Sequence, residues 1–145
     1  MRIQRFEDIK AWQEARELVK MIYNVTQDKE FIKDFGLVSQ TRRAGISIMA
    51  NIAEGFGESK RGFVQFLNYA SSSNLELQSH LYVTIDQSYI AKEIFEKMYG
   101  KSKKVGNFIN AFIKYLKGKT AQQQHSNTIK QCLLFLTLMR TDARC

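Results

Sequence analysis

One helical period organises most of this chain. In residues 63–81, apolar side chains and one asparagine recur at spacings of 4, 3, 4, 3 and 4, the heptad seam of a helix that packs against other helices. The seam consists of Phe63, Leu67, Ala70, Asn74, Leu77 and Leu81. Proline, which interrupts helices, is absent from all 145 residues. The sequence therefore predicts a largely helical protein, with Asn74 as a polar seam position that fixes register.

Three further segments carry the same period. Helices are predicted over residues 7–27, 37–56 and 91–116, and Ser59 occupies the N-cap position of the helix described above. The loops between the four segments are short. Short connections favour antiparallel neighbours. The predicted fold is all-α, an antiparallel up-down-up-down four-helix bundle with an extra C-terminal tail.

The helix predicted over residues 37–56 is lined by small residues, so a second backbone can approach it closely. Gly45 lies in its interior, where glycine costs about 1 kcal/mol relative to alanine. Close packing at this position is the expected compensation. Gly55 and Gly57 are expected to end the helix in a left-handed turn.

A polar stripe runs along the same helix. Arg43, Ser47, Asn51 and Glu54 follow one another at spacings of 4, 4 and 3 and so share a face. We interpret the stripe as an inter-helix or inter-subunit polar network in which Glu54 neutralises Arg43 or Arg42, across the stripe or a subunit boundary. The functional alternative is a carboxylate pair formed by Glu54 and Glu58.

The last segment differs from the bundle in composition. Residues 1–117 are predicted to form the four-helix bundle, and residues 118–145 a polar linker followed by a short apolar tail. The tail is too short to span a bilayer. Docking on the bundle, self-association, a fifth helix and disorder all remain open for it.

The excess positive charge lies at one end of the chain. The formal net charge is +8, and residues 91–145, with eleven basic and three acidic residues, account for all of it. Such asymmetry indicates an anionic partner, nucleic acid or a membrane surface. The alternative is a solvated face that maintains solubility. The candidate phosphate contacts are Lys101, Lys103, Lys104, Lys114, Lys117 and Lys119.

Residues suited to catalysis or metal binding are few. The histidines are His80 and His125, too few for the di-iron sites that bundles can hold. Both cysteines, Cys132 and Cys145, lie in the tail. The sequence predicts no enzyme, no metal and no cofactor. It carries no signal-peptide pattern, so we expect a cytoplasmic protein.

Three blocks of the chain resemble the bacterial 23S ribosomal RNA intervening-sequence protein family, also called four-helix-bundle proteins, over roughly residues 5–117. The matching positions are Gln40, Arg42, Arg43 and Ala44, then Ser47 to Gly55, then Ala70, Ser73, Glu76 and Leu77. Two departures stand out: Met49 replaces a proline usual in the family, and Ser72 replaces a glycine. The tail has no counterpart in the resemblance.

The resemblance implies a four-helix bundle that assembles as a ring-like homopentamer. It implies a coding region inside a ribosomal RNA gene insertion or free-standing elsewhere, and a suggested role in RNA or DNA binding. It supplies no catalytic residue. Two further hypotheses are a structural assembly module without a nucleic-acid ligand and, less favoured, a peripheral membrane protein that uses the apolar tail.

Overall fold

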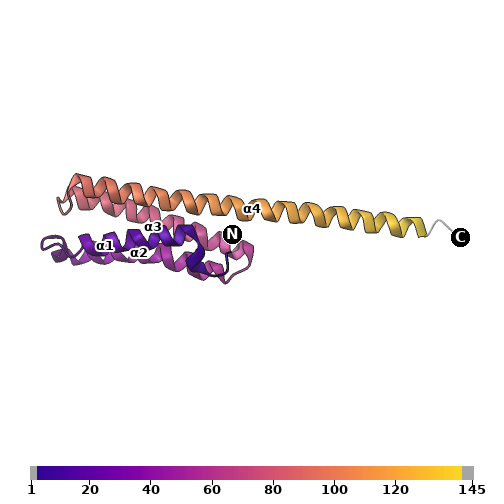
Figure 1. Cartoon of the computed structure of the whole chain (residues 1–145), viewed down its shortest axis with the longest axis horizontal. Helices are drawn as coiled ribbons and strands as arrows, with labels where there is room; N and C mark the ends of the chain where they lie inside the picture. Colours follow the sequence, from indigo (N-terminus) through magenta and orange to yellow (C-terminus); the bar gives the residue numbers. More distant parts are fainter. Residues whose placement is uncertain (1–2, 142–145) are drawn as a thin grey trace. The chain divides into compact units, whose positions relative to one another are not determined.

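The protein is described by a computed structural model that covers the backbone of residues 3–141 and the side chains of residues 3–118. This part of the chain forms four α-helices and two short 3-10 helices, with no strand (Figure 1). The predicted all-α helical bundle is confirmed. The elements in chain order are η1 (Phe6–Asp8), α1 (Lys10–Val25), η2 (Phe31–Lys33), α2 (Phe35–Phe56), α3 (Lys60–Asp86) and α4 (Lys92–Thr141).

The chain divides into two compact units, residues 1–113 and 114–145. The helix α4 continues without a break through residues 118–127, where the sequence predicted a polar linker. Lysine, alanine and glutamine in that interval favour helix, and the one glycine costs only about 1 kcal/mol. Hydrophilic composition alone therefore did not distinguish a linker from a solvated helix. The side chains of the predicted apolar tail lie outside the described residues.

Local capping sets where α2 and α3 begin. The Ser59 side chain accepts a hydrogen bond from the Gly62 backbone N–H at 3.2 Å, as the sequence predicted for an N-cap. Asp34 caps α2 in the same way, accepting from the Leu37 N–H at 3.0 Å. Each cap satisfies a backbone donor that the first helical turn leaves without an intrahelical partner.

The expected left-handed turn at the end of α2 is wrong. Gly57 has φ −80° and ψ −8°, and no glycine in the described chain has a positive φ. The glycine at position 55 serves close packing, since a Cβ there would lie 2.7 Å from both Phe63 Cδ2 and Phe66 Cβ. Glycine is therefore required here because α3 returns directly across the end of α2.

The small-residue helix packs as expected. Gly45 is buried against α1, and a Cβ at this position would lie 2.6 Å from Ile22 Cδ1 and 3.3 Å from Val19 Cγ2. Ile22 is itself fully buried. The close approach of α1 and α2 explains a glycine in a helix interior, and the two helices run side by side in Figure 1.

The α3 seam faces the core along its whole length, and its polar member is buried as predicted. Asn74 is 2% exposed; its amide donates to the Ser102 carbonyl at 3.0 Å and accepts from the Ser102 hydroxyl at 2.8 Å. Gln78 donates to the same hydroxyl at 2.9 Å. These bonds fix the register of α3 against the first half of α4, because a shift along either helix would leave buried polar groups unpaired.

Candidate nucleic-acid interface

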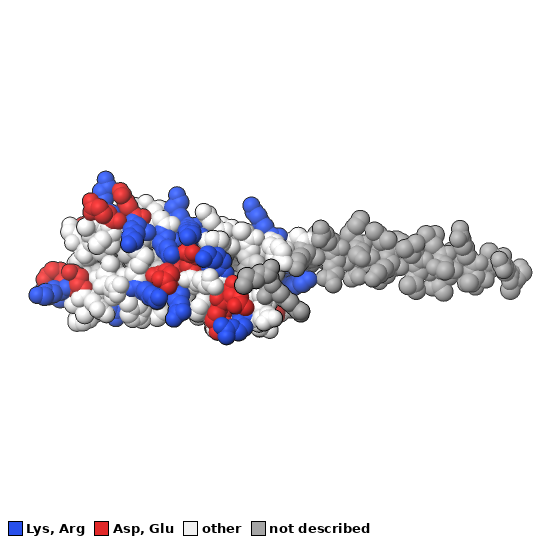
Figure 2. All heavy atoms as spheres, in the orientation of Figure 1, with Lys and Arg blue, Asp and Glu red and all other residues white. Residues whose placement is uncertain are grey.

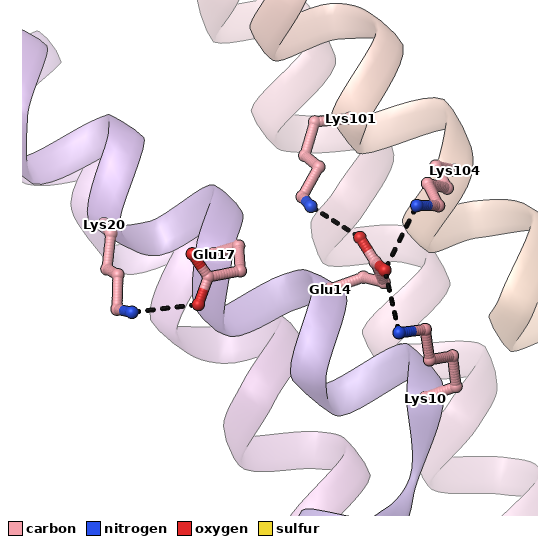
Figure 3. A network of polar contacts seen from close by, with 6 residues as sticks. All are labelled: Lys10, Glu14, Glu17, Lys20, Lys101 and Lys104. Carbon is pink, nitrogen blue, oxygen red and sulfur yellow. Dashed lines mark hydrogen bonds and ion pairs between the residues drawn. The ribbon is translucent and has the colours of Figure 1, made fainter.

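Three ammonium groups converge on one carboxylate between α1 and α4. Glu14 lies on the inner side of α1, where its side chain is only 7% exposed. It accepts a hydrogen bond from Lys101 at 2.5 Å and pairs with Lys104 at 3.2 Å and with Lys10, one turn earlier on α1, at 3.3 Å. Figure 3 shows the three lysines reaching Glu14 from different sides. We call these four residues the Glu14 cluster.

The cluster keeps Glu14 ionised. The hydrogen bond from Lys101, helped by Lys104 and Lys10, outweighs the effect of burial and lowers the pKa of Glu14 to about 2. A buried carboxylate without such donors would have a raised pKa. The single negative charge thus holds three lysines in place while leaving an excess of two positive charges.

A surface hollow of about 420 Å³ adjoins the cluster. Helix α1 contributes Glu17 and Met21, and α4 contributes Lys97, Gly100, Lys101 and Lys104. Glu17 is already paired with Lys20 at 2.9 Å, so Lys97 adds one more positive charge at the rim. Figure 2 shows basic side chains gathered around acidic ones over the middle of the bundle.

The candidate phosphate lysines do not share one face. Lys101 and Lys104 belong to the Glu14 cluster, whereas Lys103 is exposed and lies about 200° around the helix from Lys101. Lys114 and Lys117 are exposed residues of the second unit. Lys119 lies beyond the residues whose side chains are described.

Sequence reasoning missed Lys10 and Lys97. The spacing of Lys97, Lys101 and Lys104, four and then three residues, places these lysines on one side of α4 and could have been noticed. The convergence of Lys101 and Lys104 on Glu14 could not be predicted, because 87 residues separate Glu14 from Lys101. Only the packing of α1 against α4 brings them together.

The proposed polar stripe on α2 divides in two. Ser47 lies 2.8 Å from the Ser73 hydroxyl of α3, and Asn51 donates to the Ser47 carbonyl at 2.8 Å. Arg43 and Glu54 are exposed, and no ion pair is found for either within the described chain. Eleven residues of helix, about 16 Å, separate them, too far for direct contact within one α2.

The neighbouring arginine, Arg42, contacts α1. Arg42 donates to the Thr26 hydroxyl at 2.9 Å and lies over the Tyr23 ring at 4.7 Å from its centroid. It therefore fastens α2 to the end of α1, and within the described chain it forms no ion pair with Glu54.

The described side chains offer little for metal or redox chemistry. No group of three or more histidine, cysteine, aspartate or glutamate residues is placed to hold a metal ion in this part of the chain. His80 is half-buried on α3, 3.9 Å from Glu76. Among the described helices, none has the length and apolar character needed to cross a membrane.

Fold and surface together define a helical-bundle protein with a lysine-rich groove between α1 and α4. The groove consists of the Glu14 cluster and the adjoining hollow. The chain belongs to the 23S rRNA-intervening sequence protein family, which matches residues 7–111. It is similar to a solved protein of unknown function from the S23 ribosomal protein family of Bacteroides thetaiotaomicron: 27% identity, TM-score 0.66, covering 72% of this chain and 98% of that one. No curated protein matches the sequence. Neither the description of the family nor that of the solved Bacteroides protein names an enzymatic activity.

Proposed function

We propose that the protein is a non-enzymatic, self-associating bundle that binds RNA through the groove between α1 and α4. The observation that carries the proposal is the Glu14 cluster, where Lys10, Lys101 and Lys104 surround one carboxylate and Lys97 lies at the rim of the adjoining hollow. Family membership makes RNA the polyanion to test first.

The groove has the properties of a phosphate-binding surface. Lys104 and Lys10 keep more than half of their side-chain surface exposed, 53% and 57%, so each can contact a phosphate oxygen while paired with Glu14. Lys97 and Lys104 are two helical turns apart, about 10 Å. Contacts of this kind position a nucleic-acid backbone without reading its bases. We expect binding with little sequence preference.

Salt dependence provides the primary test. The affinity for a short structured RNA, measured by fluorescence anisotropy, should fall steeply with salt. A plot of log K against log salt has a negative slope, and replacing Lys97 and Lys104 by glutamine should make that slope shallower by about 1.5. A matched control, Lys29→Gln with Lys33→Gln in the segment before α2, should leave it nearly unchanged. Undetectable binding at ~50 mM salt in the wild-type protein would contradict the proposal.

Glu14 offers a second, opposite test. Replacing it by glutamine removes the one negative charge inside the cluster, so RNA should bind more tightly at low salt, by about threefold to tenfold. A site in which Glu14 itself contacted the ligand would instead lose affinity. The variant's fold is checked by circular dichroism, because losing the carboxylate also destabilises the bundle.

A structural assembly module without nucleic acid is the second candidate. It is favoured by large apolar side chains that the bundle leaves exposed, among them Leu75 at 63% and Tyr82 at 51%. The ring-like homopentamer implied by the family resemblance is the form of assembly to test. Under this alternative, the variant with glutamine at Lys97 and Lys104 would assemble like the wild type, and no RNA binding would be found.

A further inference from the structure

The hollow beside the Glu14 cluster has two walls of different chemistry. Helix α1 contributes Met21, which is half-buried, and Glu17, whose side chain is 53% exposed. Helix α4 contributes Gly100, where the helix carries no side chain, together with the lysines at positions 97, 101 and 104. Figure 3 shows Glu17 on α1 and two of these lysines on α4. A ligand that matches both walls has an apolar part with N–H donors and, beside it, negative charge.

Packing does not explain the glycine at position 100. It lies in the interior of α4, where glycine costs about 1 kcal/mol relative to alanine. A Cβ at Gly45 would collide with α1, whereas a Cβ at Gly100 would meet nothing within 4 Å. Gly100 does line the hollow, so a side chain at this position would occupy space that is now empty. Room for a ligand is therefore the role that the structure gives to this residue.

The size of the hollow suits a single nucleotide. Its volume, about 420 Å³, lies within the range of small-molecule sites, roughly 300–1,000 Å³. A continuous RNA duplex keeps its bases stacked inside the helix and cannot place one in such a hollow. A single strand or a bulge has unstacked bases that can be turned outward into a protein site.

The charges of the two walls orient a nucleotide. Lys97 is exposed and has no ion pair within the described chain, and Lys104 keeps 53% of its side chain exposed, so the phosphate belongs on the α4 side. The hydrogen bond from Lys20 lowers the pKa of Glu17, which stays ionised and repels a phosphate from the α1 side.

The α1 wall suits a base instead. The carboxylate of Glu17 accepts hydrogen bonds, and every RNA base has an N–H donor on its edge. The polarizable thioether of Met21 can lie against the face of the base. Because all the bases share these properties, the hollow accepts any of them, in agreement with the expected lack of sequence preference.

We propose that the hollow receives one unpaired nucleotide of the RNA, with its base against Met21 and Gly100 and its phosphate on Lys97 and Lys104. This inference rests on the proposed function and specifies its ligand as single-stranded or bulged RNA. Contacts to the backbone alone predict the opposite order of affinity, because a duplex has a denser negative charge than a single strand.

Three RNAs of the same sequence test the preference. They are a duplex of about 12 base pairs, the same duplex with one unpaired nucleotide at its centre, and the single strand. Fluorescence anisotropy at fixed salt should give dissociation constants for the bulged duplex and the single strand that are about tenfold lower than that of the continuous duplex.

A leucine at position 100 tests the hollow itself. Gly100→Leu should raise the dissociation constant for the bulged RNA about tenfold and leave that for the continuous duplex within about twofold. The salt slope should stay that of the wild type, because every lysine remains. Gly36→Leu is the matched control, since Gly36 is an exposed glycine in the first turn of α2, where a Cβ makes only an ordinary contact with Asp34 at 3.7 Å.

Unfolding does not explain the expected loss, since both substitutions remove a glycine from a helix and should keep or raise thermal stability. A direct readout comes from 2-aminopurine at the unpaired position, a base that fluoresces more strongly when it leaves the stack. Its fluorescence should rise on binding to the wild type and to Gly36→Leu, but not on binding to Gly100→Leu.

Three outcomes overturn the inference. These are a continuous duplex that binds as tightly as the bulged one, a Gly100→Leu variant that binds bulged RNA like the wild type, and a Gly36→Leu variant that loses as much affinity as Gly100→Leu. In each case, a salt slope that still depends on Lys97 and Lys104 would leave the proposed function standing. Absence of RNA binding in the wild type would instead overturn both.

Discussion

At the scale of single residues, Glu14 contributes both to the stability of the bundle and to the arrangement of the lysines on its surface. Its carboxylate is buried, yet the lysines that hold it are partly in solvent: Lys101 is 24% exposed and Lys104 is 53% exposed. The bundle therefore fixes the ends of three flexible side chains through one anchoring group. The same group makes stability depend on pH.

Acid should weaken the bundle through Glu14. Its folded-state pKa, about 2, lies below the ordinary value of 4.5, so the unfolded chain binds the proton more readily. The resulting stability is present above about pH 4.5 and is lost as the pH falls toward 2. Because the lysine partners are partly screened, we expect a loss of about 1–2 kcal/mol. Urea unfolding at several pH values measures it.

Glu14→Gln is the matched variant for this pH dependence. It should lower the free energy of unfolding near pH 7 by about 1–3 kcal/mol, since the lysines then repel one another without a carboxylate. Between pH 4.5 and 2 its stability curve should be flatter than that of the wild type. An equally steep curve in the variant would show that other carboxylates control the acid transition.

At the scale of elements, the helices differ in how closely they approach. The α1–α2 contact requires glycine at position 45, because Ile22 leaves no room for a methyl group. The glycine at position 100 of α4 has nothing within 4 Å of where a Cβ would be. We therefore expect alanine to have opposite effects on the free energy of unfolding at these two helical glycines.

Alanine substitution separates these two cases. Gly45→Ala should destabilise the protein by about 1–3 kcal/mol, because overpacking against a buried isoleucine exceeds the gain in helix propensity. Gly100→Ala should stabilise it by up to about 1 kcal/mol. Thermal or urea unfolding of both variants decides. If Gly45→Ala were also stabilising, α1 and α2 would not be as close as described.

The Asn74–Ser102 pair makes the α3–α4 contact a matter of register as well as of burial. Asn74→Ala and Ser102→Ala should each cost about 1–2 kcal/mol, because each leaves a buried partner unpaired. The double variant should cost less than the sum, with a coupling of about 1 kcal/mol. A double-mutant cycle by urea unfolding measures it; strict additivity would exclude a shared hydrogen bond.

At the scale of the whole molecule, the first unit contains a complete core. Fully buried side chains extend from Ala15 to Ile109, and all four helices contribute to them. The second unit, from residue 114, carries much of the C-terminal excess of basic residues. Stability and net charge are therefore distributed differently along the chain.

Truncation after Lys119 tests this distribution. The shortened chain should unfold with a free energy within about 0.5 kcal/mol of the full chain, because it retains the whole core of the first unit. Co-sedimentation of both forms with anionic vesicles addresses the membrane hypothesis. Binding that requires the tail would support that hypothesis, and a large loss of stability would show that the tail belongs to the folded core.

Much of the fold could be predicted because its signals are local. The Ser59 cap depends on residues three apart, and the Phe63 to Leu81 seam depends on a repeating interval along one helix. The glycine at position 57 was misread because a helix can end in more than one backbone conformation, and sequence does not say which. The helix α4 includes residues 118–127, where the sequence predicted a polar linker, and a solvated helix and a loop share such a composition.

The sequence by itself determined that this chain is an all-α bundle of the intervening-sequence family with its positive charge concentrated toward the C-terminus. Helical period, capping and net charge follow from neighbouring residues and from composition. Only the tertiary structure decided that Lys101 and Lys104 meet Glu14 while Lys103 lies on another side of α4. The reason is physical: attraction between side chains depends on distance in space, and that distance is set by how α1 and α4 pack.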